Sequence, residues 1–492
     1  MTRVADLPVL PGVEPIFGHV RRMQRDRLGF LYDVAHDVDR LSRFGTVAAE
    51  GAIANHPEVL AELLVEKARV FDKSFITRFA LGPLGGEGLF TSRYDLWRGQ
   101  RRIMAPLFHP SQLARYATDM VRCAERVTSE WSDGETFELL RETTRMTMSI
   151  AGKTLFDAET LGEADAIGRA LNTTLDWAAK NSPGPLAIAH LLAREALVRG
   201  ARALPQGALA NALRETASRF ERPVALVGES GRKLKAAVAV LDAEVERMIA
   251  TRRREAALGR APTDLLARLL AAQDDDGTRM TDRQLRDEVL TLFVAGHETT
   301  ATGLAWTVHC LCQNRDVYAA VQREVDALGH EPSLHDLPAL DLTLRVFKEA
   351  LRLYPPVYLL GRQATTETTL DGVTFGDRAI VLVAPFALHR RRDLWPNPER
   401  FDPSRFVAAE EAKRHRLAWL PFGAGPRVCI GNHFALMEAQ LVLATMLRRA
   451  EFEATDDETP LAGATLRPKH GVRVRVKVRQ KKATHRSGAD LS

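Results

Sequence analysis

Residues 422–431, which read FGAGPRVCIG, constrain the fold of this 492-residue chain more than any other stretch. The three glycines permit turn conformations and close backbone approaches that other residues disfavour. A helical pattern follows directly, with apolar residues at Phe434, Met437 and Leu441. Cys429 is therefore predicted to lie at a helix N-terminus, where backbone N–H groups point at its sulfur. This setting lowers the pKa of a thiol and suits it to metal binding, and the alternative is a buried structural cysteine.

A second motif, AGHETT at residues 295–300, lies inside an apolar helical pattern that spans residues 282–312. Glycine costs ~1 kcal/mol in a helix interior, so another group is expected to approach the helix closely at Gly296. The carboxylate of Glu298 and the hydroxyl of Thr299 can together hold water and relay protons. The alternative is that both side chains belong to a solvated helix face.

Two further residue pairs carry charge at helical spacing. Glu349 and Arg352 stand three residues apart, where their side chains can form an ion pair, and the YPP sequence ends this helix directly afterwards. Trp97 and Arg101 stand one helical turn apart, so both can address the same carboxylate. Neither pair identifies a function by itself.

With these motifs in this order, the chain resembles the cytochrome P450 family of haem-thiolate monooxygenases, in its soluble, bacterial-type form. Residues 422–431 match the family pattern Phe-x-x-Gly-x-Arg-x-Cys-x-Gly at every fixed position. Residues 295–299 match Ala/Gly-Gly-x-Asp/Glu-Thr, and the Glu-x-x-Arg motif is joined by PSRF at residues 403–406. The resemblance runs from the proline-rich start to the C-terminal strand and covers nearly the whole chain.

The resemblance implies a mainly α fold with a small β region, the triangular prism of the cytochrome P450 fold. It implies one domain over residues 1–479, followed by a tail at 480–492. The implied cofactor is haem b, with Cys429 as the axial ligand of the iron. A thiolate ligand pushes electron density towards the iron and favours O–O cleavage. The implied catalytic residues are Glu298 and Thr299.

Further roles follow from the resemblance alone. The implied haem-binding residues are Trp97, Arg101, Arg362, Phe422, Arg427, Cys429 and Gly431, and among them Arg101, Arg362 and Arg427 would hold the propionates. The implied structural charge network is Glu349, Arg352 and Arg405, with Arg400 as a rival to Arg405. The implied substrate pocket is formed by Phe79, Leu84, Phe90, Phe293, Ala295 and Leu359.

The predicted reaction is insertion of one oxygen atom from O2 into a hydrophobic small molecule, by hydroxylation or epoxidation. A terpenoid, a fatty acid, a steroid and a polyketide all fit an apolar pocket without acids or bases. Electrons are expected from a separate ferredoxin and ferredoxin reductase, or from a flavodoxin. Basic groups such as Arg101 and Arg102 are expected to attract this acidic partner protein. The alternatives are a hydrogen-peroxide-driven peroxygenase and a non-catalytic haem sensor.

Composition limits the remaining choices. Apolar residues make up 45% of the chain, which excludes a disordered chain, and the net charge of +5 does not indicate a nucleic-acid-binding protein. Four cysteines form no disulfide framework, and we expect a cytoplasmic location. Nowhere do about 18 apolar residues follow one another, so no transmembrane segment is expected. We expect a monomer.

Periodicity predicts the main elements. Helical patterns cover residues 57–73, 110–131, 139–155, 233–254, 282–312 and 344–353, and glycines with a proline predict a loop at 82–88. The resemblance implies that a loop around residues 75–90 contributes to the substrate pocket. Strands are predicted at 46–48, 374–383 and 472–478, the last with apolar residues inward and basic residues outward. Residues 181–220 are predicted to be a surface helix pair, or else a mobile lid or a patch that touches a membrane or a partner.

Overall fold

The computed structural model describes residues 2–14, 17–45, 51–156, 164–181, 207–219, 229–259, 264–272 and 279–479, together with 277 and scattered positions between 189 and 205. The predicted strand at 46–48, the predicted tail at 480–492 and part of the 181–220 segment therefore lie outside the described residues, whereas α11 (Ala208–Arg219) falls within that segment.

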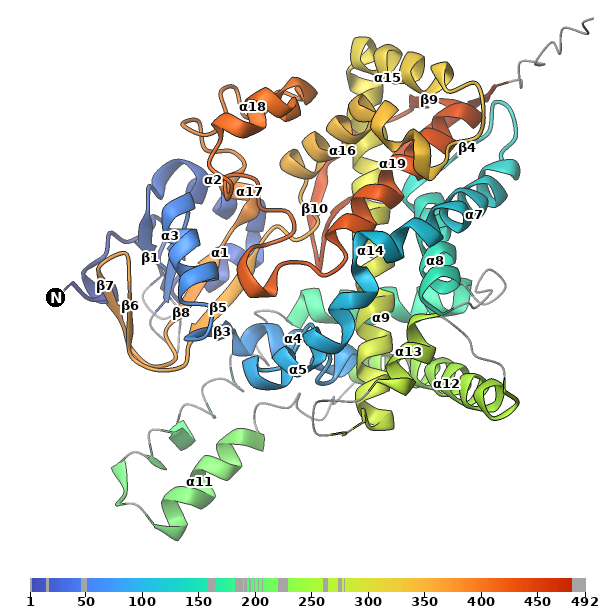
Figure 1. Ribbon diagram of the computed structural model, residues 1–492. Coiled ribbons are helices and arrows are strands. Elements are labelled where there is room, and N and C mark those ends of the chain that lie inside the picture. The colour runs from blue at the N-terminus through green and yellow to red at the C-terminus, as the bar shows by residue number, and fades with distance from the viewer. Residues whose placement is uncertain are drawn as a thin grey trace, which may run out of the picture.

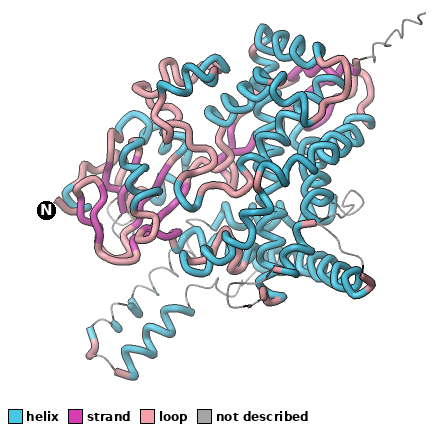
Figure 2. The backbone as a smooth tube through the Cα atoms, in the orientation of Figure 1, coloured by secondary structure: helices cyan, strands magenta, loops and turns pink. Residues whose placement is uncertain are grey.

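Helices form most of the described chain (Figures 1 and 2). The longer ones are α7 (Ala117–Ser129), α8 (Leu139–Phe156), α9 (Ala164–Asn181), α12 (Glu229–Ala257), α14 (Asp282–Gln313), α15 (Arg315–Ala327), α16 (Asp341–Leu353) and α19 (Asn432–Arg449). The shorter ones are α1 (Val20–Arg25), α2 (Arg27–Asp37), α3 (Pro57–Ala61), α4 (Phe75–Gly85), α5 (Tyr94–Met104), α6 (Pro110–Leu113), α11 (Ala208–Arg219), α13 (Leu265–Ala271), α17 (Pro385–Leu388) and α18 (Ala408–Lys413).

The strands form small sheets, of which the largest lies on the N-terminal side of the molecule (Figure 2). Its five strands, in the order β1-β2-β8-β5-β3, are β1 (Leu41–Arg43), β2 (Gly51–Ala54), β8 (Ile380–Val383), β5 (Leu360–Ala364) and β3 (Phe71–Lys73). A three-stranded sheet contains β4 (Thr136–Glu138), β12 (Arg473–Val478) and β9 (Ala450–Ala454). Two hairpins pair β6 (Thr368–Leu370) with β7 (Val373–Phe375), and β10 (Pro460–Ala462) with β11 (Leu466–Pro468).

The long helix α14 lies at the centre of the core. Thr281 and Gln284 form a capping box at its start, which satisfies N–H groups of the first turn. α8 lies along α14, and α4, α12, α16 and α19 also contact it. The hydroxyls of Thr143 and Thr147 on α8 donate to the carbonyls of Ala301 and His297 at 3.0 and 2.9 Å. These bonds fix the position of α8 against the part of α14 that carries the AGHETT motif.

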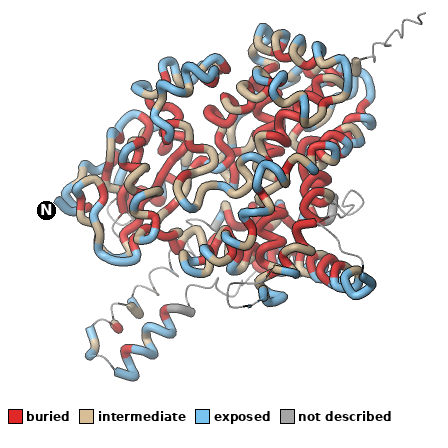
Figure 3. The backbone as a smooth tube through the Cα atoms, viewed as in Figure 1, coloured by how far each residue is buried: buried red, intermediate tan, exposed pale blue. Residues whose placement is uncertain are grey.

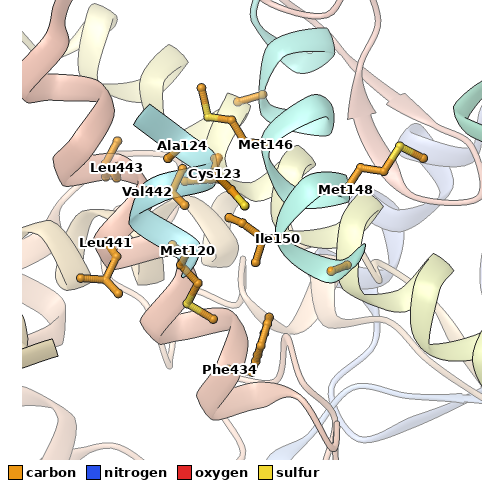
Figure 4. Close-up of a cluster of buried hydrophobic side chains, with 14 of the residues drawn as sticks. Met120, Cys123, Ala124, Met146, Met148, Ile150, Phe434, Leu441, Val442 and Leu443 are labelled. Atoms are coloured by element: carbon orange, nitrogen blue, oxygen red, sulfur yellow. The ribbon is translucent and has the colours of Figure 1, made fainter. Parts of the chain in front are cut away.

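Buried residues concentrate along α8, α14 and α19 (Figure 3). Figure 4 shows part of the largest hydrophobic cluster, where side chains from α7, α8 and α19 gather. They include Met120, Cys123, Ala124, Met146, Ile150, Phe434, Leu441 and Val442. This packing holds α19, the helix that follows the FGAGPRVCIG segment, in a fixed position.

The predicted mainly α architecture with minor sheet is confirmed. The helical patterns at 139–155, 233–254 and 282–312 are confirmed as α8, α12 and α14, and the pattern at 344–353 lies within α16. The alternation in β12 is also confirmed, because Val474 and Val476 are buried while Arg473 and Arg475 are exposed.

Several element predictions are wrong. Residues 82–85 continue the helix α4, because the Ser74 side chain caps its start and the turn comes only at Gly86, where φ is +48°. The helical pattern from residue 57 gives way to a π-turn at Glu62–Glu66 and then to β3. Residues 110–129 are divided between α6, a 3-10 turn and α7, and the predicted strand at 374–383 is two strands, β7 and β8.

Candidate active site

The FGAGPRVCIG segment is a tight loop that packs against the turn after α3. Gly425 has a φ of +69°, and a Cβ there would lie 1.8 Å from the carbonyl oxygen of Leu64, so only glycine fits. Gly423 also has a positive φ, of +70°. The N–H of Cys429 donates to the carbonyl of Phe422 at 2.9 Å, which closes the loop immediately before α19. The sequence thus holds Cys429 at the start of a buried helix.

Cys429 is an exposed residue, yet burial is the largest influence on its thiol and raises the pKa. The N–H of Gly431 and the guanidinium of Arg101 act to lower the pKa, but they are outweighed. The prediction of a lowered pKa is therefore wrong for the protein groups alone, because desolvation exceeds the helix N-terminal effect. A metal cation bound to the sulfur would favour the thiolate and reverse this shift.

The five-stranded sheet places two half-buried basic side chains side by side. The antiparallel register of β3 and β5 sets Lys73 opposite Arg362. Burial lowers the pKa of Lys73 well below its usual value and lowers the pKa of Arg362 to about 10, and the charge of Arg427 adds to both effects. The Lys73 ammonium donates to the carbonyls of Leu89 and Phe90 at 2.9 and 2.5 Å.

Arg427, from the cysteine-containing loop, completes this group and is paired with Asp72. One of its nitrogens donates to Asp72 at 2.6 Å, and its guanidinium stacks 4.6 Å from the centroid of the Trp97 ring. The N–H of Tyr94 also donates to Asp72, at 3.0 Å. The sequence predicts that Arg427 holds a haem propionate, but the guanidinium of Arg427 also pairs with Asp72.

The charges do not balance within the described residues. Lys73, Arg362 and Arg427 are basic, and Asp72 is the acidic side chain that pairs with Arg427. Glu288 also faces Lys73, but burial raises the pKa of its carboxyl to about 8, so it is mostly protonated at neutral pH. Three basic side chains beside one paired carboxylate favour an anionic guest. Haem, with two propionates and a cationic iron for the Cys429 sulfur, fits this set of residues.

Trp97 and Arg101 lie on α5 beside the cysteine-containing loop, but they do not meet at one position. The Trp97 ring lies against Arg427, while Arg101 donates to the carbonyl of Val428 at 2.9 Å. Both residues therefore hold the loop that carries Cys429. Their joint contact with one carboxylate stays a prediction.

Glu349 and Arg352 form a fully buried ion pair, with two hydrogen bonds of 2.7 and 2.8 Å. The remaining donors of Arg352 reach the carbonyls of His389, Pro398 and Arg400 at 2.6–3.1 Å. Arg405 places its Nε 3.4 Å from Glu349 Oε1. The structure thus brings the guanidinium of Arg405 to the pair, whereas Arg400 contributes its backbone carbonyl and its side chain is exposed.

Glu298 and Thr299 are both half-buried on α14. Thr465, in the β10–β11 hairpin, donates its hydroxyl to Glu298 Oε1 at 2.8 Å, and Thr299 donates to the Ala295 carbonyl at 2.8 Å. Gly296 faces α8, because a Cβ there would lie 3.7 Å from Ala151. The group that approaches Gly296 is therefore a neighbouring helix, and the contact would be an ordinary one.

The predicted pocket residues are divided among several hydrophobic clusters. Leu84 and Phe293 belong to the largest cluster, Phe79 packs with Phe75 and Trp177, and Leu359 packs against a third cluster. Phe90 lies 5.6 Å from the Lys73 ammonium, measured to its ring centroid, next to the half-buried basic side chains. Their assembly into one substrate pocket stays a prediction.

Four residues of the site were missed by the sequence analysis, namely Asp72, Lys73, Thr465 and Glu438. Asp72 and Lys73 stand at the end of a short strand, and their signal is a charged pair directly after an apolar run. Glu438 is a fully buried carboxyl on α19; burial raises its pKa well above the usual value, and the Thr300 hydroxyl acts to lower it. Thr465 carries no sequence signal at all.

Comparisons with known proteins agree with this geometry. The family model described as Cytochrome P450 matches residues 8–203 and 210–474. Cyclooctatin synthase of Streptomyces melanosporofaciens is 33% identical over 465 residues, which cover 94% of this chain and 92% of that protein. Pentalenene oxygenase of Streptomyces avermitilis is 31% identical over 475 residues, which cover 95% of this chain and 97% of that protein.

A further relative and a solved structure extend the similarity. Cyclooctat-9-en-7-ol 5-monooxygenase of Streptomyces melanosporofaciens is 32% identical and covers 93% of this chain and 90% of its own length. The crystal structure of the cytochrome P450DA heme domain superposes with a TM-score of 0.78 at 25% identity, over 96% of this chain and 98% of that chain. Among the described residues, none of the helices has the length and apolar character needed to cross a bilayer.

Proposed function

This chain belongs to the cytochrome P450 family, and from that premise we propose that its substrate is a terpenoid, which it hydroxylates or epoxidises. The reaction class follows from the family: the chain is a monooxygenase with haem b as cofactor, and it inserts one oxygen atom from O2 into a hydrophobic small molecule. Fatty acids, steroids and polyketides are the other substrates that this class admits.

The observation that carries the substrate class is the apolar character of the candidate pocket residues. Leu84, Phe293 and Leu359 offer no charge to pair with a carboxylate or an amine. Two of the named relatives are a pentalenene oxygenase and a cyclooctat-9-en-7-ol monooxygenase. A hydrocarbon-rich substrate would be selected here by shape and hydrophobic burial.

The sulfur of Cys429 would bind the haem iron, and Lys73, Arg362 and Arg427 would hold the haem propionates. When bound, haem supplies the reductive activation of O2, with one oxygen atom inserted into the substrate and the other released as water. Arg101 and Trp97 would keep the cysteine-containing loop in place through their contacts with Val428 and Arg427. The buried Glu349–Arg352 pair would stabilise the fold beneath this loop.

Glu298 and Thr299 would transfer protons to the reaction site. The half-buried carboxylate of Glu298 can take up and release a proton, and the Thr299 hydroxyl can pass one on when it leaves the Ala295 carbonyl. A hydrogen bond from Thr465 keeps one carboxylate oxygen of Glu298 in a defined place. These residues supply the acid–alcohol pair that the family pattern contains.

The electrons would come from a separate ferredoxin with its reductase, or from a flavodoxin. We further propose that residues 1–479 form a single domain, and that the protein acts as a monomer in the cytoplasm. The exposed Arg102 on α5 lies one residue beyond Arg101, which contacts the cysteine-containing loop. An acidic partner that docks at α5 would therefore approach the cysteine side of the haem.

Spectral titration tests the substrate class. The reconstituted protein is titrated with terpenoid hydrocarbons and alcohols, and with fatty acids, steroids and polyketide lactones of matched size. Terpenoids are expected to shift the haem absorption band at micromolar concentration and to yield oxygenated products with surrogate redox partners and NAD(P)H. If only fatty acids or charged ligands shift the band, the terpenoid proposal is wrong.

A further inference from the structure

We propose that Thr465, in the turn of the β10–β11 hairpin, is a positioning residue for Glu298. Its hydroxyl donates to Glu298 Oε1 at 2.8 Å, between positions 167 residues apart in the chain. The inference rests on the proposed role of Glu298 in proton transfer. It assigns to the hairpin a part in setting the orientation of that carboxylate.

The hairpin backbone is fixed on both sides of Thr465. The N–H of Gly463 donates to the Thr465 carbonyl at 3.1 Å, and the N–H of Leu466 donates to the Pro356 carbonyl at 3.0 Å. Tyr358 donates its hydroxyl to the Gly463 carbonyl at 2.6 Å. The position of Thr465 therefore does not depend on its contact with Glu298.

A second contact ties the hairpin to the helix that carries Glu298. The indole N–H of Trp306 on α14 donates to the Leu466 carbonyl at 2.9 Å, and Trp306 is fully buried. Trp306 stands eight residues after Glu298, which is about 12 Å along an α-helix. Because Trp306 joins α14 to the residue next to Thr465, the hairpin stays attached to α14 when the bond to Glu298 is removed.

The hydrogen bond also lies away from bulk water. Thr465 is 8% exposed, and Glu298 is half-buried. A charge-assisted hydrogen bond is stronger where water does not compete. A glutamate side chain has several rotamers, and a proton relay needs the carboxylate in the one that reaches its partner. Thr465 would select that rotamer before the substrate arrives.

The test uses Thr465→Val, which keeps the shape and removes the donor, and Thr465→Ser, which restores it. In the holoenzyme, Thr465→Val is expected to lower product-forming kcat about tenfold and to divert reducing equivalents to hydrogen peroxide. The KM and the spectral Kd for substrate are expected to stay within about twofold, because binding does not use this bond. Thr465→Ser is expected to recover most of kcat.

A second readout does not involve turnover. In a crystal structure of Thr465→Val, the Glu298 carboxylate is expected to leave its position or to occupy several rotamers, while the hairpin backbone stays in place. The matched control is Thr455→Val, which removes a threonine hydroxyl that lies 3.4 Å from the surface carboxylate of Asp456. This control is expected to change neither kcat nor the Glu298 conformation.

The variant Glu298→Gln separates this inference from the role it rests on. If Glu298→Gln lowers kcat but Thr465→Val leaves kcat, coupling and the carboxylate position unchanged, the positioning role is wrong and the proton role stands. If Glu298→Gln leaves kcat and coupling unchanged, the proton role is wrong. If Thr465→Val weakens substrate binding as much as it lowers kcat, and Thr465→Ser gives no recovery, the contact is structural only.

Discussion

Arg352 shows how a buried charge is stabilised at the scale of a single residue. Its side chain is fully buried on α16, and every nitrogen of its guanidinium has an acceptor among the Glu349 carboxylate and the carbonyls of His389, Pro398 and Arg400. A charge buried this deeply is tolerated because the desolvation cost is offset by an ion pair and complete hydrogen bonding. Removal of the arginine leaves the buried Glu349 carboxylate with only the longer contact to Arg405 as an ion pair, 3.4 Å away.

Arg352→Gln is therefore expected to lower the free energy of unfolding by about 3 kcal/mol or more, measured by urea denaturation. The matched control on the same helix is Arg345→Gln, which breaks the solvent-exposed pair of Arg345 with Asp341, 2.8 Å apart. That pair is worth less than about 1 kcal/mol. Equal losses for the two variants would contradict the structural role of the buried network.

Glu288 makes stability depend on pH. Burial raises the pKa of its carboxyl from 4.5 to about 8, against the N–H of Leu89 and the charge of Lys73, which lower it. Between these values the folded protein holds a proton that the unfolded chain releases. The free energy of unfolding is thus expected to fall as pH rises through this window, by up to about 1.4 kcal/mol per pH unit.

The measurement is urea denaturation between pH 5 and 8 for the wild-type chain and for Glu288→Gln, which keeps an acceptor for Leu89 but cannot ionise. Relative to the wild type, the variant is expected to gain stability as the pH rises. Parallel curves for the two proteins over the whole window would show that Glu288 titrates at its ordinary pKa.

At the scale of an element, the cysteine-containing loop depends on two glycines for different reasons. Gly423 needs only the positive φ, since no atom lies within 4 Å of a Cβ built there. Gly425 needs both the positive φ and the space, since its Cβ would collide with the Leu64 carbonyl. Substitution of Gly423 therefore tests backbone strain alone, whereas substitution of Gly425 tests backbone strain together with a steric collision.

Gly425→Ala is expected to displace the loop and to abolish thiolate ligation, seen as loss of the red-shifted carbon-monoxide band of the reduced protein. Gly423→Ala is expected to keep the band and to lose about 1–2 kcal/mol of stability, the cost of a left-handed residue with a Cβ. Retention of full thiolate ligation in Gly425→Ala would mean that the loop does not require contact with Leu64.

The same scale shows what sequence patterns can predict. The cysteine-containing loop, the AGHETT helix and the Glu349–Arg352 pair are local motifs, and each lies on the predicted element. The glycines and the proline of residues 82–88 have low helix propensity and therefore predict a loop. Residues 82–85 are nevertheless helical in α4, because the Ser74 cap and the burial of Phe79 stabilise the helix. The partners Lys73 and Thr465 reach the site through strand register and hairpin position, which no local pattern records.

At the scale of the whole molecule, the site is assembled from distant parts of the chain. The ion pair of Arg427 with Asp72 spans 355 residues, and the sheet brings β3 next to β5. Such long-range contacts join the first and last hundred residues into one structure. Arg101 on α5 contacts the cysteine-containing loop and its neighbour Arg102 is exposed, which supports the proposal that a redox partner docks at α5.

Arg102→Glu is accordingly expected to lower kcat/KM for an acidic ferredoxin about tenfold at low salt, with the difference from wild type shrinking as ionic strength rises. Arg232→Glu, a charge reversal at an exposed position on α12, is the control and is expected to have little effect. The measurement is NAD(P)H-driven turnover against ferredoxin concentration at several salt concentrations. Turnover that does not respond to salt would contradict an electrostatic docking site at α5.

The central claim is that the sulfur of Cys429 is the axial ligand of a haem iron. The direct measurement is the carbon-monoxide difference spectrum of the purified, haem-loaded and reduced protein, alongside Cys429→Ala. We expect the red-shifted band typical of thiolate ligation in the wild type and its absence in the variant. A wild-type protein without that band, or a variant that keeps it, would contradict the account.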